Sequence, residues 1–401
     1  MLAYPIRLCN RQEAERVLRS IDVEPYAVEL LSPKSQHLNI VLKTVKTSWA
    51  NIIKQEMLAC GGDAAISRSS YACLEKHTDI LLMGNVSTLE RFVSKMRMQP
   101  ECFSNVADDV EKIIKNSKHE VKIGNRNYDL SKDFIVLGIL NITPDSFSDG
   151  GKFNDYDSAM KHVEHLLSSG ANVIDVGGES TRPGSQGVSV QEEIDRVVPI
   201  IEAINKKFDV LTSIDSYKPE VIKSALSSGV KLVNDISAGK GIESTLDDIK
   251  KYEASALIMM NLTVGSYNGS TPNKDLSDPV ATFFEFCESN EKKFTSGGLL
   301  SERLIFDPGI GFGLSRTDTG RLLKNMYAIT ATNFAVCAGL SRKSYLGAIT
   351  GLEVGERDAI TNAISLSLME QGVRIFRTHD VKGLVGVIKF YQSIGGSTLS
   401  V

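Results

Sequence analysis

Cysteine is scarce in this sequence, in which six cysteines are scattered over 401 residues. No C-x-x-C pair occurs, so the chain lacks the spacing from which zinc sites and redox motifs are built. It also lacks the dense cysteine pattern of small, disulfide-stapled secreted domains. We therefore expect reduced thiols, no metal site built on cysteine, and a cytoplasmic location.

Long apolar runs are also missing. A helix that crosses a bilayer needs about 20 mainly apolar residues, and the sequence contains no such stretch. A signal peptide needs only a shorter apolar core, but the first residues soon reach the polar side chains of Asn10, Arg11 and Glu13. These absences argue against a membrane partner.

An excess of charge of one sign is absent too. The chain has 45 Lys and Arg residues against 49 Asp and Glu residues, for a formal net charge of -4. Proteins that hold nucleic acid usually show a basic patch or stripe, whereas the basic residues here are spread along the chain. We therefore expect no nucleic-acid partner and a small-molecule ligand instead.

What the sequence does contain is the balance of a globular protein, with 42% hydrophobic and 23% charged residues. Its length is that of two domains. A polar, charged segment between about Ser104 and Lys132 precedes the apolar run that begins at Phe134. We place the domain boundary in this segment and predict a small domain over residues 1–120 and a larger one over residues 131–401.

The larger region alternates short β-branched or aliphatic runs with longer amphipathic stretches, the pattern of strands and helices around a parallel sheet. Eight such units in roughly 265 residues match a (β/α)8 TIM barrel. An open doubly wound sheet is the alternative, but it usually has fewer strands and gathers its ligand contacts at one crevice. The eight predicted strands cover residues 134–140, 173–176, 210–214, 232–234, 256–260, 304–306, 334–338 and 374–376.

The smaller region mixes both kinds of segment, and we predict a small α/β domain of unknown role. The sequence Gly61-Gly62-Asp63 follows one of its predicted helices. It is either a ligand-binding loop or the turn that ends the helix, and a C-capping glycine is common at such a position. The predicted helices cover residues 12–18, 48–60 and 89–96, and the predicted strands cover residues 38–42 and 80–83.

Polar side chains stand at the ends of seven of the eight predicted barrel strands, and the fifth strand ends instead in Met259 and Met260. In a TIM barrel the active site lies at these ends. A single buried Asp or Asn is more often a helix cap or a satisfied core group. A buried polar group without a partner costs about 1–3 kcal/mol, however, so a whole ring of them indicates a site. The ring consists of Asn141, Asp175 with Glu179, Thr181 and Arg182 just after it, Asp215, Asn234, Asp235, Asp307, Ser341, Arg342, Lys343, Arg377 and His379.

One part of this ring predicts a pocket for a flat heterocycle. Asp215 and Asp307 supply acceptors, and they stand beside the amide of Asn234 and the cation of Lys343. This set suits a ring that presents N–H donors on one edge and lone pairs on another. The side chains that we expect over the faces of this heterocycle are Met259 and Phe312.

Another part of the ring predicts an anion pocket. Arg377, His379 and the amide of Asn141 would hold a phosphate by charge-assisted hydrogen bonds. Two glycine-rich segments, residues 141–151 and residues 177–184, are longer and more polar than tight turns require. We expect them to be lids that close over the reactants.

Seven segments of the sequence resemble the successive signature segments of bacterial dihydropteroate synthases, which belong to the pterin-binding enzymes. The similarity extends from about Phe134 to the end of the chain. The segments stand at predicted strand ends, in the order of the family. They read GILNITPDSFSDGG, GGESTRPG, SIDSYKP, VNDIS, DPGIGFG, GLSRKS and RTHDV.

The resemblance implies a reaction and three groups of site residues. The reaction condenses 6-hydroxymethyl-7,8-dihydropterin pyrophosphate with p-aminobenzoate and releases pyrophosphate, a step of folate synthesis. The implied pterin-binding residues are Asp215, Asn234, Met259, Asp307, Phe312 and Lys343. The implied pyrophosphate-binding residues are Asn141, Arg182, Arg377 and His379, which form the catalytic set together with Lys343. The implied p-aminobenzoate residues are Phe147, Thr181, Pro183 and Ser344.

The resemblance further implies Mg²⁺ bridging Asn141 to the pyrophosphate, a homodimer, and sulfonamides in the place of p-aminobenzoate. The chain departs from the family after the fifth strand. Where the family commonly shows Met-His-Met followed by Gly-x-Pro, this chain has Met259-Met260-Asn261-Leu262-Thr263. We therefore assign no ligand contacts to that loop from the resemblance.

Two alternatives remain open. A pterin-dependent methyltransferase is thought to use a similar barrel and similar pterin-binding residues, and a pterin-binding protein without activity would keep them as well. The segments Ser341-Arg342-Lys343-Ser344 and Arg377-x-His379, with the two long loops, favour the synthase. They would have no evident use without pyrophosphate and p-aminobenzoate.

Overall fold

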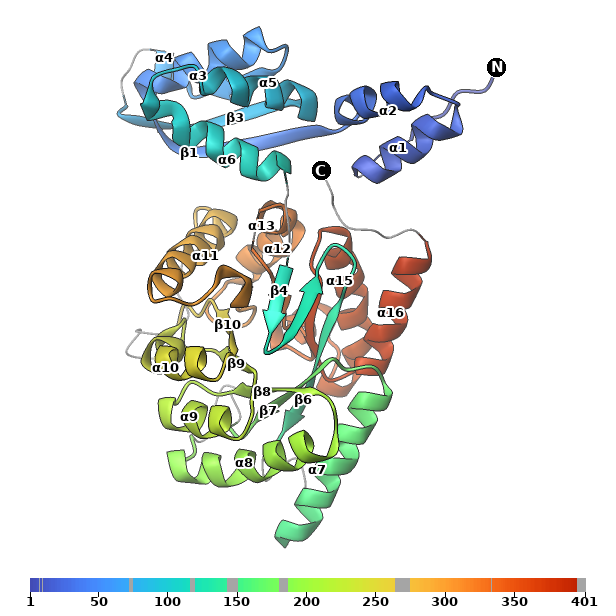
Figure 1. Cartoon of the computed structure of the whole chain (residues 1–401), viewed down its shortest axis with the longest axis vertical. Helices are drawn as coiled ribbons and strands as arrows, with labels where there is room; N and C mark the ends of the chain where they lie inside the picture. Colours follow the sequence, from blue (N-terminus) through green and yellow to red (C-terminus); the bar gives the residue numbers. More distant parts are fainter. Residues whose placement is uncertain are drawn as a thin grey trace. The chain divides into compact units, whose positions relative to one another are not determined.

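The computed structural model describes residues 1–6, 8, 10–71, 75–115, 120–142, 151–179, 187–263, 275–332 and 334–394, with backbone alone at 151–155. The chain forms two compact units, Met1–Ser117 and Lys118–Ser397. Figure 1 shows strands and helices in both units.

The amino-terminal unit is a three-stranded antiparallel sheet in the order β1-β3-β2, with helices packed on it. Alternate residues of β1 and β3, such as Ile40 and Leu82, are buried in one hydrophobic cluster with side chains of α3, α5 and α6. This bears out the predicted small α/β domain. The elements are α1 (Arg11–Ser20), α2 (Pro25–Leu31), β1 (His37–Lys46), α3 (Thr47–Ala59), β2 (Asp63–Ile66), α4 (Arg68–Tyr71), β3 (His77–Asn85), α5 (Val86–Met96) and α6 (Ser104–Lys115).

The turn after α3 explains the two neighbouring glycines. Gly61 has a φ of +83°, which favours glycine, and its N–H donates to the carbonyl of Leu58. A Cβ atom on Gly62 would lie 2.9 Å from the carbonyl oxygen of Met83. The glycines therefore end a helix and allow close backbone approach, as the capping interpretation expects.

The larger unit is the predicted TIM barrel. Its eight strands lie in the order β11-β10-β9-β8-β7-β6-β13-β12, and a parallel bridge between Phe306 and Val336 joins the two ends of the sheet. The strands are β6 (Ile135–Asn141), β7 (Val173–Gly177), β8 (Leu211–Asp215), β9 (Leu232–Asp235), β10 (Ser255–Met259), β11 (Leu304–Asp307), β12 (Cys337–Ala338) and β13 (Ile375–Thr378). The helices are α7 (Gly151–Ser168), α8 (Val190–Lys207), α9 (Pro219–Ser227), α10 (Lys240–Lys251), α11 (Pro279–Ser296), α12 (Arg316–Lys324), α13 (Tyr327–Thr330), α14 (Ser344–Thr350), α15 (Asp358–Glu370) and α16 (Val381–Ser393).

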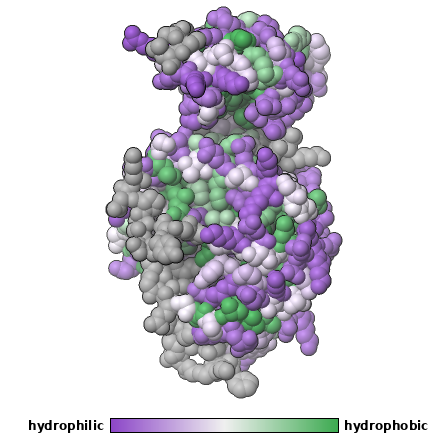
Figure 2. All heavy atoms as spheres, turned by 90° about the vertical axis from the view of Figure 1, so that its left-hand side faces the viewer, coloured by the Kyte–Doolittle hydropathy of each residue, from purple (hydrophilic) through white to green (hydrophobic). Residues whose placement is uncertain are grey.

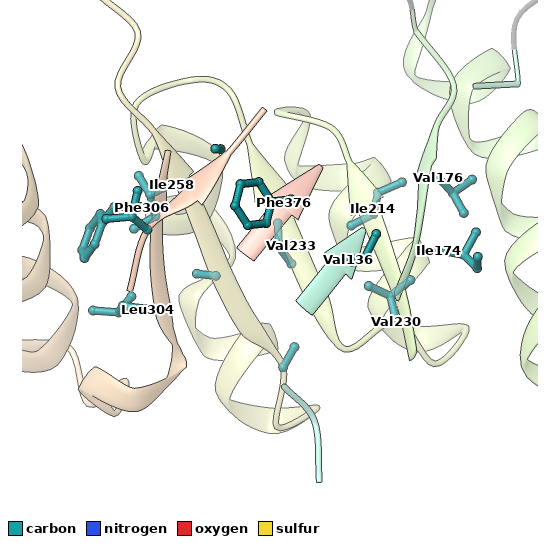
Figure 3. Close-up of a cluster of buried hydrophobic side chains, with 14 of the residues drawn as sticks. Val136, Ile174, Val176, Ile214, Val230, Val233, Ile258, Leu304, Phe306 and Phe376 are labelled. Atoms are coloured by element: carbon teal, nitrogen blue, oxygen red, sulfur yellow. The ribbon is translucent and has the colours of Figure 1, made fainter. Parts of the chain in front are cut away.

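Successive side chains of each strand point to opposite sides of the sheet. One set, which includes Val136, Ile174, Ile258 and Phe376, is buried in a cluster with side chains of the surrounding helices (Figure 3). The other set points into the barrel. Its members near the strand beginnings are apolar and form a second cluster, which includes Ile135, Leu137, Val173, Leu211, Leu232, Leu257, Ile305, Cys337 and Ile375.

A short hairpin contacts the amino-terminal end of the barrel. It consists of β4 (Glu120–Ile123) and β5 (Arg126–Asp129), and its side chains Val121 and Ile123 are buried in the same cluster as the first inward residues of the strands. The hydroxyl of Ser255, where β10 begins, donates to the carbonyl of Lys122. Residues 121–130 stood outside both predicted domains because the surrounding sequence is polar, but Val121, Ile123 and Leu130 are part of the barrel core.

The surface is as polar as the composition of a globular protein predicts. The face drawn in Figure 2 is largely hydrophilic, with smaller hydrophobic areas between the polar ones. Within the described parts of the chain, no helix combines the length and the apolar character needed to cross a bilayer.

Candidate active site

Strand register brings several predicted residues to one level at the carboxyl-terminal rim of the barrel. Asn141 of β6 is the Cα partner of Gly177 of β7, and Gly177 is the partner of Asp215 of β8. Asp215 is in turn the partner of Asn234 of β9. Four neighbouring strands therefore end in one row of positions, three of which carry polar side chains.

Arg377 of β13 lies at the centre of a buried ionic cluster. Its Nε is 2.5 Å from Oδ2 of Asp175, and its Nη2 is 2.5 Å from Oδ2 of Asp215. The same oxygen of Asp175 accepts a hydrogen bond of 3.2 Å from Nδ2 of Asn234. Asp175 is fully buried, and the side chains of Asp215 and Arg377 are 12% and 19% exposed. Residues from β7, β8, β9 and β13 thus meet inside the barrel.

The titration of this cluster is shifted by burial and by its own charges. The pKa of Asp215 is raised to about 6, mainly by burial; Arg377 and Lys343 act against this rise, and the charge of Asp175 adds to it. Burial lowers the pKa of Arg377, but the two carboxylates outweigh burial and raise it. The guanidinium therefore stays charged, whereas Asp215 takes up a proton in slightly acidic solution.

Asp307 and Lys343 form the opposite side of the rim. Oδ1 of Asp307 accepts a hydrogen bond of 2.7 Å from the N–H of Gly309, and burial raises the pKa of Asp307. Nζ of Lys343 lies 4.4 Å from the ring centre of Phe312. Burial lowers the pKa of Lys343 to about 8, against the attraction of Asp307. The ammonium therefore lies in a place where its proton can be lost near neutral pH.

The turn after β11 depends on one glycine. Gly309 has a φ of +68°, and a Cβ atom there would lie 1.7 Å from the carbonyl oxygen of Met260. Met260 in turn donates its N–H to the carbonyl of Asp307. The backbones that follow β10 and β11 therefore touch at a place where no larger residue fits.

The loop after β10, where the sequence departs from the family pattern, is held by its own contacts. Nδ2 of Asn261 donates to the carbonyl of Ile236, and its Oδ1 accepts from the N–H of Thr263. The N–H of Leu262 donates to the carbonyl of Phe312. Asn261 thus supports the loop. Met259, directly before it, is buried and is the Cα partner of Asp307.

His379 is fixed by Ser341. The serine hydroxyl accepts a hydrogen bond of 3.1 Å from the backbone N–H of His379 and lies 2.9 Å from its Nδ1. The hydroxyl can donate its proton to Nδ1 or accept a second hydrogen bond, so the direction of this contact depends on the tautomer of the ring. When the hydroxyl donates to Nδ1, the neutral ring carries its proton on Nε2. The residue then presents a donor away from Ser341.

Asn141 stands where β6 ends, beside a small gap above Gly177. A Cβ atom on Gly177 would lie 3.5 Å from Oδ1 of Asn141 and 3.6 Å from Cβ of Asp215. Because Gly177 has no side chain, the amide and the carboxylate face the same open position.

Other predicted residues have different positions. Arg342, with a φ of +58°, makes a bidentate ion pair of 3.0 and 2.8 Å with Asp358, which orders the backbone next to Lys343. Ser344 is exposed in the first turn of α14. The predicted residues Phe147, Thr181, Arg182 and Pro183 lie outside the described residues.

Asp235, which the sequence analysis placed in the polar ring, caps the beginning of a helix instead. Its carboxylate accepts hydrogen bonds from the N–H groups of Ser237, Gly241 and Ile242, where α10 begins. It is the neighbour of Asn234, and consecutive strand residues face opposite sides. Asp235 therefore points toward the helices while Asn234 points into the barrel.

Asp175 was noted in the sequence and assigned no ligand, yet it binds both Asn234 and Arg377. Its position along the strand identifies it. Asp175 lies two residues after the inward Val173 and two before Gly177, so its side chain is on the inward face of the strand. A polar side chain at an inward position above an apolar layer faces the site.

Lys218, after β8, is a second residue that the sequence did not single out. Its Nζ lies 2.5 Å from Oε2 of Glu179, 2.7 Å from Oε2 of Glu193 and 2.6 Å from the carbonyl oxygen of Val188. Glu179 precedes and Val188 follows the segment 180–186, so one ammonium holds the described chain on both sides of it.

Comparisons with known proteins give one consistent result. The family model described as pterin binding enzyme matches residues 137–379. The dihydropteroate synthase of Clostridium beijerinckii is 40% identical over 262 residues, which are 65% of this chain and 94% of that protein. The dihydropteroate synthase of Haemophilus influenzae is 37% identical over 262 residues, 64% of this chain and 93% of that protein.

Solved structures show the same similarity in three dimensions. The dihydropteroate synthase of Xanthomonas albilineans with 4-aminobenzoic acid has a TM-score of 0.63 and 33% identity, covering 70% of this chain and 99% of its own. The Yersinia pestis enzyme in a sulfonamide drug complex has a TM-score of 0.62 and 33% identity, covering 69% of this chain and 100% of its own.

Proposed function

Because this chain belongs to the pterin-binding enzyme family, as a dihydropteroate synthase, we propose that the polar ring at the carboxyl-terminal rim of its barrel is the active site. The enzyme condenses 6-hydroxymethyl-7,8-dihydropterin pyrophosphate with p-aminobenzoate to give 7,8-dihydropteroate and pyrophosphate. The similarity to dihydropteroate synthases argues against the two alternatives, a methyltransferase and an inactive pterin-binding protein. The observation that carries the proposed site is the buried cluster of Arg377, Asp175, Asp215 and Asn234.

The acidic side of the ring would bind the pterin. Oδ1 of Asp215 is buried and has no hydrogen-bond partner in the part of the chain that the structure describes, which makes it available to an N–H donor of the ligand. Lys343 supplies a donor for the pterin's lone pairs. Asn234 and Asp307 complete the polar contacts, and Met259 and Phe312 supply apolar and aromatic surface for the ring faces. The predicted set for the heterocycle is thus assigned to the pterin.

The cationic side would hold the pyrophosphate. Nε and Nη2 of Arg377 are directed at carboxylates, which leaves Nη1 to face the leaving group. His379 adds an Nε2–H donor when its Nδ1 accepts from the hydroxyl of Ser341. Asn141 and Arg182 are the remaining residues assigned to this group. Together they would stabilise the negative charge that develops on the leaving pyrophosphate.

Mg²⁺ fits this side of the ring as an ion carried mainly by the substrate. Among the residues that the structure describes, no three His, Cys, Asp or Glu side chains are grouped to hold a metal. Mg²⁺ is usually bound through one or two protein oxygens together with phosphate oxygens and water, and the amide oxygen of Asn141 at the gap above Gly177 is such an oxygen. When bound, the ion would neutralise part of the leaving-group charge.

The residues assigned to p-aminobenzoate are Phe147, Thr181, Pro183 and Ser344. Ser344 is exposed at the start of α14, directly after Lys343, which supports this assignment. A sulfonamide would occupy the same position and compete with p-aminobenzoate.

The residues indicate how the reaction proceeds. The aromatic amine is neutral at pH 7, so the protein needs no strong base to prepare it. The amine nitrogen forms a bond to the pterin methylene while the bond from the methylene to the pyrophosphate oxygen breaks, and the nitrogen then releases one proton to solvent. The electron-rich pterin would stabilise a cationic methylene, and the carboxylates of Asp175 and Asp215, which we assign to the pterin side, would add to this stabilisation. We therefore expect a largely dissociative step.

The protein is also proposed to work in the cytoplasm as a homodimer. The described cysteines Cys60, Cys102, Cys287 and Cys337 are free thiols, which is usual in a reducing compartment. Exposed apolar side chains on the barrel helices, Ile349 of α14 and Phe390 of α16, offer surface to a second copy. Light scattering on the purified chain tests the dimer directly.

An assay of pyrophosphate release tests the proposed site. The purified chain is mixed with the pterin pyrophosphate, Mg²⁺ and p-aminobenzoate, and the Arg377→Lys and Asp215→Asn variants are compared with it. We expect release by the natural chain and a strong reduction in both variants, with Lys223→Met on the exposed side of α9 as the unaffected control. Undiminished release by both variants would contradict the proposed site.

A further inference from the structure

We propose that Asp175 is a positioning residue that sets the hydrogen-bonding direction of the pterin pocket, because one of its oxygens holds both Asn234 and Arg377. The inference rests on the proposed assignment of the pterin to this side of the ring. It adds a residue that does not itself touch the substrate and a reason for the selectivity of the pocket.

Asp175 connects strands that are not neighbours in the sheet. In the order β9-β8-β7-β6-β13, strand β8 separates Asp175 from Asn234, and strand β6 separates it from Arg377. Both contacts therefore cross the interior of the barrel. Oδ2 of Asp175 accepts from Nδ2 of Asn234 at 3.2 Å and from Nε of Arg377 at 2.5 Å.

The contact with Asn234 decides which end of its amide faces the ligand. An ionised carboxylate only accepts hydrogen bonds, so the amide must turn its NH2 group to Asp175. The carbonyl oxygen Oδ1 of Asn234 then points away from Asp175. Asn234 is the Cα partner of Asp215, whose Oδ1 is buried and has no hydrogen-bond partner among the described residues. The pocket thus presents two acceptors side by side.

Two adjacent acceptors select a ligand whose ring carries two neighbouring hydrogen-bond donors on one edge. The 2-amino group and the neighbouring ring N–H of a pterin supply two donors in a row. A lumazine, which carries a carbonyl oxygen in place of the 2-amino group, would direct a lone pair at one of the acceptors. A site built to receive a hydrogen bond rejects an analogue that cannot donate it.

The contact with Arg377 keeps the guanidinium in place when the substrate binds. Arg377 is shared between Asp175, which is fully buried, and Asp215, whose side chain is 12% exposed. A ligand that takes hydrogen bonds from Asp215 leaves the contact with Asp175 intact. The donors that remain on Arg377 keep their direction toward the leaving group.

The surroundings of Asp175 argue against a role in stability alone. The inward layer directly below it is apolar, with Val173 on the same strand and Leu211 and Leu137 on its neighbours. Oδ1 of Asp175 is buried and has no hydrogen-bond partner within the described segments. A buried carboxylate with an unpaired oxygen is destabilising where an apolar residue would fit. The positioning of Asn234 and Arg377 gives this carboxylate a function.

The test compares the full-length chain with its Asp175→Asn variant, which keeps the shape and removes the charge. Asn can donate as well as accept, so the amide of Asn234 is free to turn in the variant. Calorimetry measures the affinity for two unreactive probes, pterin-6-carboxylic acid and lumazine-6-carboxylic acid. We expect the natural chain to prefer the pterin by at least about tenfold and the variant to prefer it by less than about threefold. The KM for p-aminobenzoate should stay within about twofold.

Ser213→Ala is the matched control. Ser213 is the Cα partner of Asp175 on β8, is equally buried, and its hydroxyl has no hydrogen-bond partner. This variant changes the same inward layer and should leave the preference for the pterin unchanged. A mere disturbance of the barrel interior would lower the affinity for both probes equally in both variants.

A second variant keeps the test decisive if Asp175→Asn does not fold. Asp175→Glu retains a carboxylate that only accepts, so weaker binding with an intact preference for the pterin is expected. Loss of the preference in this variant, or its full retention in Asp175→Asn, would overturn the inference. If the natural chain binds neither probe and releases no pyrophosphate, the proposed function itself fails, which is a separate result.

Discussion

Asp215 and Arg377 are 162 positions apart in the sequence, yet Oδ2 of the aspartate lies 2.5 Å from Nη2 of the arginine. The first ends β8 and the second lies in β13, so two strands, β7 and β6, separate them in the sheet. The contact exists only because the sheet closes into a barrel. The same closure forms the candidate site, and several predictions depend on the charges of this pair.

Arg377→Met should lower kcat by about 100-fold, the size of effect found when one group that stabilises developing charge is removed. The methionine cannot hold the leaving pyrophosphate, and it leaves the carboxylates of Asp175 and Asp215 without their cation. Steady-state kinetics with the pterin pyrophosphate gives the value. Arg377→Lys keeps a positive charge but cannot contact both carboxylates as the guanidinium does. Its kcat should lie between those of the natural chain and the methionine variant. An unchanged kcat in the methionine variant removes Arg377 from the leaving-group side.

The pH dependence of kcat/KM should be bell-shaped, with limbs near pH 6 and pH 8. Below the pKa of about 6, Asp215 is protonated and loses an acceptor for the pterin. Above the pKa of about 8, Lys343 loses its positive charge. The rate should therefore rise through the first limb, peak near pH 7 and fall through the second. The pH profile of the remaining activity of Asp215→Asn should lack the acidic limb. If that limb persists in the variant, it reports the titration of a group other than Asp215.

The sequence predicts much of this site because it depends on a simple alternation. Inward positions of a barrel strand recur every two residues, and polar residues at the ends of predicted strands therefore converge. The alternation alone does not show which of two consecutive polar residues faces inward. Asn234 points into the barrel, whereas Asp235 caps α10. Which of two neighbours faces inward depends on the register between strands, which short sequence segments do not specify.

Partnerships across the barrel could not be predicted. The sequence grouped Arg377 with His379 in an anion pocket, whereas two of its nitrogens contact Asp175 and Asp215. Such contacts depend on the curvature of the sheet and on side-chain length. The hairpin of β4 and β5 escaped prediction for a different reason, since its few apolar residues stand in a polar segment and are buried only by the barrel.

Gly309→Ala should destabilise the barrel by about 3 kcal/mol, the upper range for inserting a methyl group into packed structure. The added Cβ would overlap the carbonyl oxygen of Met260 at 1.7 Å, at a φ of +68°. The shift would also disturb the contact between the N–H of Gly309 and Asp307, so pterin affinity should fall. Urea unfolding gives the stability change. Gly355→Ala is the control, because nothing lies within 4 Å of its Cβ position, and it should be neutral.

The last prediction concerns the two hydrophobic side chains at the amino-terminal end of the barrel. A chain that begins at Lys118 keeps the hairpin of β4 and β5, whereas a chain that begins at Leu130 loses it. Without the hairpin, the inward apolar residues at the strand beginnings lose contact with Val121 and Ile123. Each fully buried side chain of this kind contributes about 1.5–3 kcal/mol, so the shorter chain should be less stable by roughly 3–6 kcal/mol.

The longer chain should retain pyrophosphate release with unchanged kcat, because the described residues of the candidate site all lie between Asn141 and His379. Thermal melts and kinetics on the two chains separate these effects. Equal stability of both chains would show that the hairpin adds nothing to the barrel core. A loss of activity in the chain beginning at Lys118 would instead assign a part in the reaction to residues 1–117.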